Sequence, residues 1–152
     1  GNSKLETFAL AELLERAAQD ARELRADIEV RANLDPMELY ANEDLVRRAV
    51  GNLLSNAVRH CNSVVSLTIT RSDDSIFIVV KDDGAGVPAT ARERIFEPFA
   101  QLDESRQRDA GGAGLGLAIV RRIAEAHGGS VRVGEAKAGG ARFVLELPLR
   151  PV

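Results

Sequence analysis

The sequence predicts an α/β fold: a two-layer sandwich in which three long helices cover one face of a mixed, mostly antiparallel sheet. Apolar residues recur with helical spacing in three segments, at 8–25, 43–60 and 115–127. Short runs rich in β-branched residues occupy much of the remaining chain and give about five to seven strands. With 152 residues, 45% of them hydrophobic, the chain can bury a core between two layers. We therefore expect one domain over residues 1–152, with Gly1-Asn2-Ser3 as a possible remnant of expression.

The first elements have clear local signals. In the first helix, the leucines and alanines between Leu10 and Leu24 fall on one face. Short strands are expected at 28–30 and 37–40, around an Asp-Pro turn. Asn42 is a suitable N-cap for the second helix, because its side-chain oxygen can accept a hydrogen bond from the first turn.

The later elements follow from similar patterns. Segments 64–70 and 75–81 are rich in Val and Ile and are separated by Ser-Asp-Asp, so we expect a hairpin. A short helix is expected at 90–96, and Gly128-Gly129 ends the third long helix. Two strands, joined by a glycine-containing turn, close the chain at 130–135 and 141–149.

The composition excludes several classes of protein. The formal net charge is −3, which argues against a general nucleic-acid-binding protein. The apolar run at 76–80 is far too short to span a membrane, so we expect no membrane contact by this domain itself. No signal peptide is visible, and the single Cys61 cannot form an internal disulfide. These features favour a reducing, cytoplasmic location.

The segment GGAGLGLA, at 111–118, places four glycines at the start of the third helix. Glycines allow a ligand to approach backbone N–H groups, and the N-terminus of a helix attracts phosphate. Leu115 and its neighbours do not supply the Lys-Ser/Thr of a P-loop, and the glycine spacing differs from a dinucleotide-binding fingerprint, which argues against a Rossmann oxidoreductase. A flexible loop before a helix is the alternative interpretation.

The second helix carries a polar stripe formed by Asn52, Asn56 and Arg59. Asparagine lowers helix stability, so a solvated stripe is one interpretation and a binding function is the other. An asparagine oxygen can ligate Mg²⁺ together with substrate phosphates, and an arginine can neutralise phosphate charge.

Asp82 begins the loop DDGAGVP directly after a predicted strand. Gly84 and Gly86 would let the backbone turn sharply there. The carboxylate would then point into the space that the loop encloses and would need a hydrogen-bond donor, such as the exocyclic amine of adenine. A simple Asp-Gly turn is the alternative.

Four segments in this order resemble one family. NLLSNAVRH (52–60), DDGAGVP (82–88), RIFEPF (94–99) and GGAGLGLAI (111–119) are similar to the N box, the first glycine box, the F box and the second glycine box of the catalytic, ATP-binding domain of bacterial two-component sensor histidine kinases. That domain has the Bergerat fold, shared with DNA gyrase, mismatch-repair and heat-shock ATPases. The resemblance covers nearly the whole chain and implies ATP and Mg²⁺ as the bound molecules.

The resemblance also implies roles for individual residues. Asn56 would hold Mg²⁺, and Asn52, Asn56 and Arg59 would form the catalytic group beside the phosphates. His60 would approach the phosphates or the ribose, and Asp82 would accept the adenine amine. The other expected nucleotide-binding residues are Gly84, Gly86, Val87, Phe99, Arg106, Arg108, Gly112, Gly114, Leu115, Gly116 and Leu117.

Residues 100–113 resemble the mobile lid of the family, with the F box at its base. Phe96 and Phe99 would anchor this lid, or would be ordinary core aromatics. Arg106 and Arg108 would reach the γ-phosphate, or would be solvated loop charges. Ala113 stands where the family often has Ser or Thr, which leaves backbone N–H groups as the main donors at that point.

Asn52 indicates phosphoryl transfer. Hydrolysing relatives have a glutamate there that activates water, and an amide is no general base. The resemblance therefore implies transfer from ATP to a histidine on the kinase's own dimerisation and phosphotransfer domain, and then to a response regulator, with the full-length protein anchored in the bacterial inner membrane. Neither His60 nor His127 has the sequence context of that acceptor. The alternatives are a regulatory module that binds ATP or ADP without transfer, a hydrolysing ATPase and a Ser/Thr kinase of the anti-sigma type.

Overall fold

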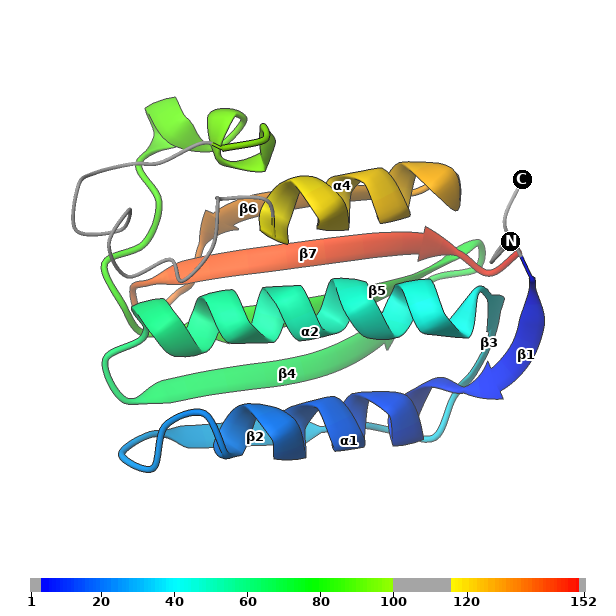
Figure 1. Ribbon diagram of the computed structural model, residues 1–152, viewed down its shortest axis with the longest axis horizontal. Helices are drawn as coiled ribbons and strands as arrows, with labels where there is room; N and C mark the ends of the chain where they lie inside the picture. Colours follow the sequence, from blue (N-terminus) through cyan, green and yellow to red (C-terminus); the bar gives the residue numbers. More distant parts are fainter. Residues whose placement is uncertain (1–3, 100–115, 151–152) are drawn as a thin grey trace.

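The computed structural model describes residues 4–99 and 116–150, and it confirms the predicted two-layer α/β architecture. Three helices lie side by side against one face of a sheet (Figure 1). They are α1 (Leu10–Arg22), α2 (Glu43–His60) and α4 (Gly116–Ala126). Each places its apolar residues toward the sheet, as the helical periodicity of the sequence predicts.

The main sheet has the strand order β2-β4-β5-β7-β6. The β2–β4 pair is parallel and the other pairs are antiparallel, so the sheet is mixed and mostly antiparallel, as expected. The hairpin predicted from the Ser-Asp-Asp turn is the β4–β5 pair. The strands span Glu29–Asn33 (β2), Val64–Arg71 (β4), Ser75–Asp82 (β5), Ser130–Glu135 (β6) and Ala141–Pro148 (β7).

The N-terminal region differs from the sequence expectation. A short strand β1 (Glu6–Ala9) precedes α1 and pairs with β3 (Glu38–Ala41) in a separate two-stranded sheet. Phe8 continues the helical spacing in the sequence, but it lies opposite Leu39 in this sheet and is buried there. The helix therefore starts at Leu10 and not at residue 8, because strand pairing overrides the local pattern.

Three smaller differences complete the comparison. Helix α1 ends at Arg22, and Leu24 beyond it is 58% exposed, so burial does not extend the helix to residue 25. The strands expected around the Asp-Pro turn do not pair with each other, because β2 joins β4 and β3 joins β1. The short helix expected at 90–96 is two 3₁₀ turns, η1 (Ala89–Ala91) and η2 (Arg94–Phe96).

The core lies between the helix layer and the sheet. Leu53 of α2 and Ile78 of β5 are fully buried there. Asn42 caps α2 as predicted: its Oδ1 accepts a hydrogen bond from Leu45 N–H at 3.1 Å, while its own N–H donates to His127 Nε2 at 3.2 Å. Within 4–99 and 116–150, no helix is both long and apolar enough to span a membrane.

Candidate nucleotide-binding site

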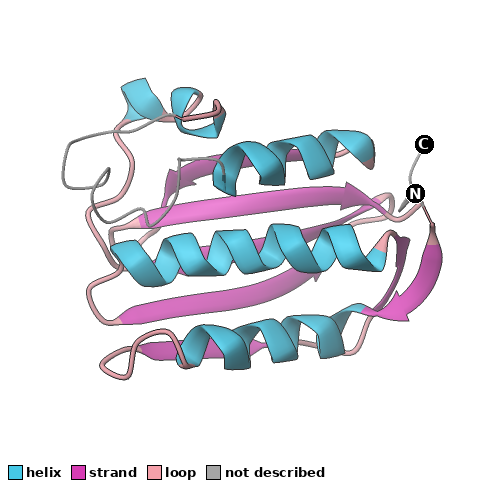
Figure 2. Ribbon diagram, viewed as in Figure 1, coloured by secondary structure: helices cyan, strands magenta, loops and turns pink. Residues whose placement is uncertain are grey.

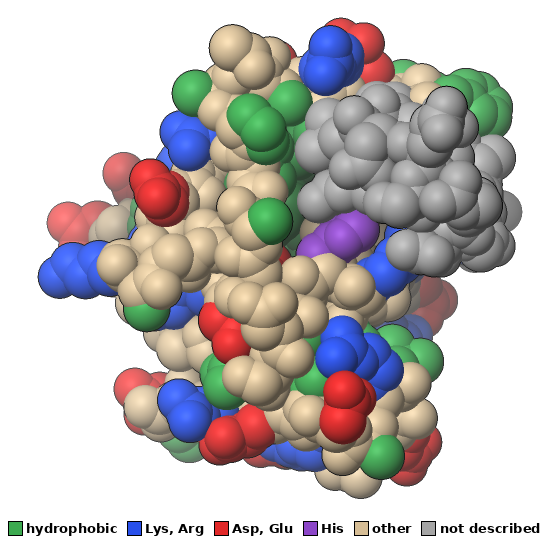
Figure 3. All heavy atoms as spheres, turned by 90° about the vertical axis from the view of Figure 1, so that its left-hand side faces the viewer, with side chains coloured by type: hydrophobic (Ala, Val, Ile, Leu, Met, Phe, Trp, Pro, Cys, Tyr) green, Lys and Arg blue, Asp and Glu red, His purple; other side chains and the backbone are tan. Residues whose placement is uncertain are grey.

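The end of α2, the end of β5, the start of α4 and the β6–β7 turn meet at one end of the sandwich (Figure 2). Viewed onto this end, a histidine side chain is visible at the surface (Figure 3). A small pocket lies here, and side chains or backbone from all these segments line it. The lining residues are Asn56, His60, Asp82, Gly86, Val87, Ile95, Leu117, Ala141 and Phe143.

Asp82 is the acidic residue of the pocket. It is the last residue of β5 and is 5% exposed. Its Oδ1 accepts hydrogen bonds from Gly84 N–H at 2.8 Å and Ala141 N–H at 3.3 Å. These two backbone contacts orient the carboxylate. The carboxylate is therefore held in one place with an apolar wall beside it.

The loop after β5 packs tightly against the end of α2. A Cβ on Gly84 would lie 2.0 Å from the carbonyl oxygen of His60, so no larger residue fits without a shift of the backbone. Gly86 has a φ of +80° and lines the pocket itself. The two glycines predicted to shape the pocket thus bring the loop backbone to the helix end and turn it toward the sheet.

The Asp83 side chain lies away from the pocket, at the connection between α2 and β4, and it ties the loop to the start of β4. Its carboxylate accepts hydrogen bonds from the N–H groups of Asn62 (2.8 Å), Ser63 (3.0 Å) and Val64 (3.1 Å), and from the Ser63 hydroxyl (2.9 Å). Partial burial works to raise the pKa of Asp83, but the hydrogen bonds from Ser63, Val64 and Asn62 outweigh it and lower the pKa to about 2. This side chain clamps the connection between α2 and β4.

The three residues of the polar stripe on α2, Asn52, Asn56 and Arg59, lie in different surroundings. Asn56 and His60 are half-buried and line the pocket. Asn52 lies one turn earlier, where its Nδ2 donates a hydrogen bond to the carbonyl oxygen of Gly116 at 3.2 Å, joining α2 to the start of α4. Arg59 is exposed and is not among the residues that line the pocket.

The F box contributes through its apolar residues. Ile95 lines the pocket, and Phe96 is 2% exposed, with its ring 6.1 Å from the ring of Phe143 in an edge-on arrangement. Phe96 is thus a core aromatic that supports the pocket wall, which agrees with the second of its two interpretations. Phe99 is 62% exposed and has a positive φ of 65°.

The predicted site residues are only partly within the described segments. Of them, Asn56, His60, Asp82, Gly86, Val87 and Leu117 come together at one pocket, and Gly116 lies beside it at the start of α4. The predicted lid at 100–113 lies outside the described residues, as do the following predicted site residues: Arg106, Arg108, Gly112, Gly114 and Leu115.

Sequence reasoning missed the wall that β7 supplies. Ala141 and Phe143 line the pocket because β7 pairs with β5. In this register Arg142 lies opposite Lys81, so the start of β7 lies beside the end of β5. Gly140 also belongs here, since a Cβ on it would lie 2.0 Å from the carbonyl oxygen of Asp82. The Gly-Gly pair before the last strand was visible in the sequence, but its neighbour across the sheet was not.

The pocket combines polar and apolar groups. In the described part of the chain, no group of three or more His, Cys, Asp or Glu side chains could hold a metal ion. The polar groups are an amide, an imidazole and a carboxylate beside apolar side chains. The cavity measures about 10 Å³, room for one water, so a planar base needs more space than the described side chains leave in this structure.

The two histidines are in different environments. His127 is 3% exposed, its Nδ1 lies 2.9 Å from the carbonyl oxygen of Ile123, and its Nε2 accepts the Asn42 N–H. Nδ1 thus holds the ring against α4, and Nε2 joins it to the cap of α2. His60 is the last residue of α2 and faces the pocket. Neither position is that of a nucleophile presented to a separate domain.

Comparison with known sequences agrees with this geometry. The sequence profile described as "Histidine kinase-, DNA gyrase B-, and HSP90-like ATPase" matches residues 41–151. Sensor protein RstB of Escherichia coli K12 is 49% identical over 105 residues, which cover 69% of this chain and 24% of RstB. The chain thus spans about a quarter of the length of that curated relative.

Comparison with solved structures gives the same family. The mycobacterial sensor histidine kinase MprB superposes with a TM-score of 0.84 at 29% identity, over 98% of this chain and 100% of the MprB chain. Full-length ShkA in complex with AMPPNP superposes with a TM-score of 0.85 at 33% identity, over 99% of this chain and 32% of ShkA.

Proposed function

We propose a function that starts from one fact: the chain belongs to the histidine kinase-, DNA gyrase B- and HSP90-like ATPase family. Within that family, it acts as the ATP-binding catalytic domain of a two-component sensor histidine kinase. It binds ATP with Mg²⁺ and donates the γ-phosphate to a histidine on a phosphoacceptor domain outside the 152 residues. The N–P bond to the imidazole forms as the bond between the γ-phosphorus and the bridging oxygen of ADP breaks.

The observation that carries the proposal is the position of Asp82. A buried carboxylate, oriented by two backbone N–H groups, lies beside the apolar side chains of Val87, Ile95 and Phe143. This combination suits adenine, whose rings need apolar contact and whose amine needs an acceptor. The complex of the similar kinase ShkA with AMPPNP, an ATP analogue, supports the same ligand.

Asn56 is the residue that would hold Mg²⁺. Its amide oxygen is a hard ligand, and Mg²⁺ prefers to combine one or two protein oxygens with water and substrate phosphates. One amide oxygen in the pocket is therefore enough protein ligation for Mg²⁺, because water and the phosphates of ATP can supply the other ligands. Bound Mg²⁺ would supply neutralisation of phosphate charge.

The protein's own share of the chemistry is positioning. Asp82 would fix the base, while Asn56 and His60 border the phosphate side. Arg59 is exposed at the end of α2, where it could meet phosphates that extend from the pocket. In phosphoryl transfer, holding donor and acceptor in line with neutralised charge supplies most of the rate enhancement.

Asn52 favours transfer over hydrolysis. Its amide has no basic group to activate water, and its Nδ2 is bound to the carbonyl oxygen of Gly116. The attacking nucleophile must then come from another domain. We further propose that the 152 residues fold as one domain and that the full-length kinase is membrane-anchored and passes its phosphoryl group to a response regulator.

The first test is a calorimetric titration of the chain with ATP and Mg²⁺ and, in parallel, with GTP and Mg²⁺. We expect binding of ATP and little binding of GTP, because guanine presents a carbonyl oxygen to the Asp82 carboxylate. A site built around such a hydrogen bond can discriminate by about 10⁴-fold. Equal binding of the two nucleotides would remove Asp82 from base recognition.

The second test is phosphotransfer in the full-length kinase that contains this chain. With radiolabelled ATP, we expect an acid-labile and alkali-stable phosphohistidine on the phosphoacceptor domain. Nucleotide binding without any phosphoprotein would instead support a regulatory module. Rapid release of phosphate by the isolated chain would support a hydrolysing ATPase, and an acid-stable phosphoserine would support a Ser/Thr kinase.

A further inference from the structure

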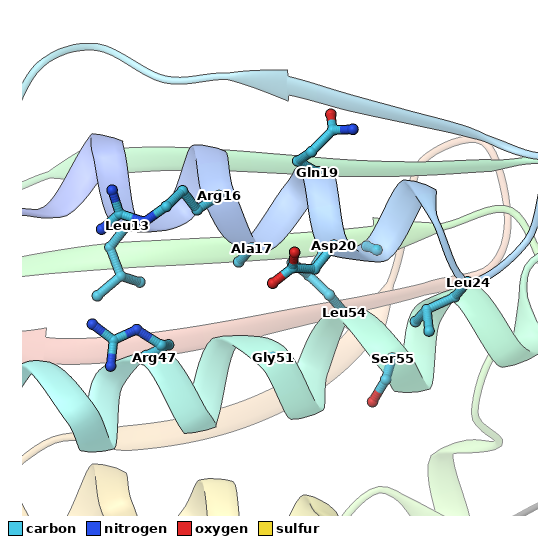
Figure 4. Close-up of a pocket in the computed structure, with 11 residues that line it drawn as sticks. Leu13, Arg16, Ala17, Gln19, Asp20, Leu24, Arg47, Gly51, Leu54 and Ser55 are labelled. Atoms are coloured by element: carbon cyan, nitrogen blue, oxygen red, sulfur yellow. The ribbon is translucent and has the colours of Figure 1, made fainter.

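The turn between α1 and β2 lies beside the end of α2, although it lines no part of the candidate nucleotide pocket. Helices α1 and α2 run in the same direction, and a groove with Gly51 on its α2 side lies between them (Figure 4). Leu24 and Ser55 lie at one end of this groove, so the chain that leaves α1 passes beside the last turns of α2. Arg25 is the next residue of that chain.

Arg25 caps the carboxyl end of α2 from a position 33 residues before it in the sequence. Its Nη1 donates hydrogen bonds to the carbonyl oxygen of Val58 at 2.8 Å and to that of Cys61 at 3.3 Å. Val58 belongs to the last turn of α2, and Cys61 is the residue that follows the helix. The last four carbonyl groups of a helix lack partners within the helix, and an arginine side chain is one group that can satisfy them.

Val58 needs a donor from outside the helix because the helix stops one turn after it. In a longer helix, the N–H of residue 62 would bond to the carbonyl oxygen of residue 58. Here the Asn62 N–H donates to the Asp83 carboxylate at 2.8 Å instead. The Cys61 thiol also lies 3.5 Å from the Val58 oxygen, but a thiol is a weak donor. Arg25 therefore supplies the strong hydrogen bond that the end of α2 lacks.

Asp27 holds the Arg25 guanidinium in this orientation. Its two carboxylate oxygens accept hydrogen bonds from Nε at 3.1 Å and from Nη2 at 3.0 Å. A two-point contact of this kind fixes the plane of the guanidinium, which leaves Nη1 for the helix carbonyls. The Arg25 side chain is 31% exposed and the Asp27 side chain 72%, so solvent screens the charge of the pair. The effect of the pair on α2 is therefore one of geometry.

The helix end that Arg25 holds carries the side chains on the phosphate side of the candidate site. Asn56 and His60 line the pocket from the last turns of α2, and Arg59 is exposed beside them. Helix ends fray when their terminal groups lack partners. Loss of the Arg25 contacts would therefore displace the last turn of α2, while Asp82 would keep its place at the end of β5.

We infer that Arg25 is a positioning residue for the phosphates of the bound nucleotide. It acts through the last turn of α2, whose side chains meet the phosphates, and it has no part in the recognition of adenine by Asp82. This inference rests on the proposed function, because it requires ATP as the ligand. It gives the α1–β2 turn, which belongs to none of the four sequence boxes, a part in nucleotide binding.

Arg22 provides the matched control for a substitution of Arg25. It is the last residue of α1, and its Nε and Nη2 donate to the carbonyl oxygen of Val30 in β2, at 3.1 and 3.0 Å. Among the described residues, none of its hydrogen bonds reaches α2. Arg22→Ala thus removes the same kind of contact, a guanidinium on a backbone carbonyl, from a different place. Both alanine variants should lower the urea midpoint of the 152-residue chain.

Calorimetric titrations with ATP and Mg²⁺, and with adenosine, separate positioning from a general loss of stability. Arg25→Ala should weaken ATP binding about tenfold, the value of one hydrogen bond that involves a charged group. Its affinity for adenosine should stay within about twofold of the parent, because adenosine has no phosphates for the end of α2 to meet. Arg22→Ala should leave both affinities unchanged. Arg25→Lys, which keeps a donor for the helix carbonyls, should bind ATP more tightly than Arg25→Ala does.

Hydrogen exchange without nucleotide tests the structural step by itself. Arg25→Ala should speed exchange of the Cys61 N–H, which donates to the carbonyl oxygen of Ala57 at 2.8 Å, and Arg22→Ala should not. Unchanged exchange in Arg25→Ala, unchanged ATP affinity, or an equal loss of affinity for ATP and adenosine would overturn the inference alone. Failure of the proposed function would look different, because the parent chain would then bind no ATP, and the positioning role would fall with it.

Discussion

Asp82 and Asp83 are adjacent in the sequence and chemically identical, but the end of β5 places their side chains in different surroundings. Asp82 is 5% exposed and faces the pocket, with hydrogen bonds from Gly84 and Ala141. Asp83 is half-buried and faces the α2–β4 connection, where it accepts hydrogen bonds from three consecutive N–H groups. The alternation of side chains at a strand end thus separates the proposed binding residue, Asp82, from a structural one, Asp83.

The difference teaches that carboxylates in a conspicuous motif need not share its function. The Asp82 carboxylate lines the pocket, whereas the Asp83 carboxylate accepts hydrogen bonds from three backbone N–H groups and the Ser63 hydroxyl at the α2–β4 connection. A ligand in the pocket can therefore reach the Asp82 carboxylate but not the Asp83 carboxylate. Variants of the two residues should therefore separate nucleotide affinity from the free energy of unfolding.

The largest effect is expected from Gly140→Ala, which acts on both aspartates at once. The added Cβ would lie 2.0 Å from the Asp82 carbonyl oxygen and 3.0 Å from the Asp83 Cα, at a φ of +91°. We expect a loss of about 3 kcal/mol or more in the free energy of unfolding, measured with urea. Gly139→Ala is the control, because φ there is +93° but no atom lies within 4 Å of the new Cβ. It should cost about 1 kcal/mol, the backbone strain alone.

The next effect separates the two aspartates by ligand binding. Asp82→Asn should weaken ATP binding by about 100-fold, since the amide accepts the adenine amine less strongly than a carboxylate does and can turn a donor toward it. Its fold should persist, because an amide oxygen can still accept the Gly84 and Ala141 N–H groups. Asp83→Asn is the control in the same calorimetric titration. A similar loss of affinity in both variants would contradict the division of roles.

A smaller effect separates the aspartates by stability. Asp83→Ala should lower the free energy of unfolding by about 2 kcal/mol, because it leaves the N–H groups of Asn62, Ser63 and Val64 without their acceptor. ATP affinity at pH 7 should stay within about twofold of the parent chain, since Asp83 does not line the pocket. Urea unfolding and calorimetry on one preparation provide both values. Unchanged stability would show that water replaces the carboxylate without loss.

The smallest effect is the dependence of stability on pH. The pKa of Asp83 is about 2 in the folded chain, below its ordinary value of 3.8. The ionised side chain therefore stabilises the fold above about pH 4, and this contribution is lost as the pH falls through about 2. Between pH 5 and pH 2, the parent chain should lose more stability than Asp83→Asn does, by less than the loss expected from Asp83→Ala because solvent screens this partly exposed group. Parallel pH profiles of the two chains would contradict the lowered pKa.

Much of the candidate site could be predicted because its polar residues are arranged locally. Asn52 and Asn56 are one helical turn apart, and Asp82 stands where a strand meets a glycine-rich loop, so spacing alone marks them. In the structure, Asn56 and Asp82 line the same pocket. It gives Asn52 a contact with the start of α4, which the spacing within one helix could not reveal.

Other features depended on contacts between distant segments. The partners of Asp83 lie about 20 residues away, and Phe143 reaches the pocket only because β7 lies beside β5. Phe8 fits a helix by spacing but forms a strand, because Leu39 lies opposite it. Each of these outcomes depends on contacts between segments that are distant in the sequence, and such contacts produce no recognisable pattern in the local sequence.

By itself, the sequence determined the order of helices and strands from the first helix onward, the two-layer class and the polar groups available for a nucleotide. These follow from periods of 3.6 and 2 residues and from turn chemistry, which act over a few neighbouring positions. Only the tertiary structure decided that Asp82 faces inward and Asp83 outward, which apolar residues complete the pocket, and that Gly51 opens a groove between α1 and α2. Those outcomes depend on which surfaces are buried against each other, and burial is a property of the whole fold.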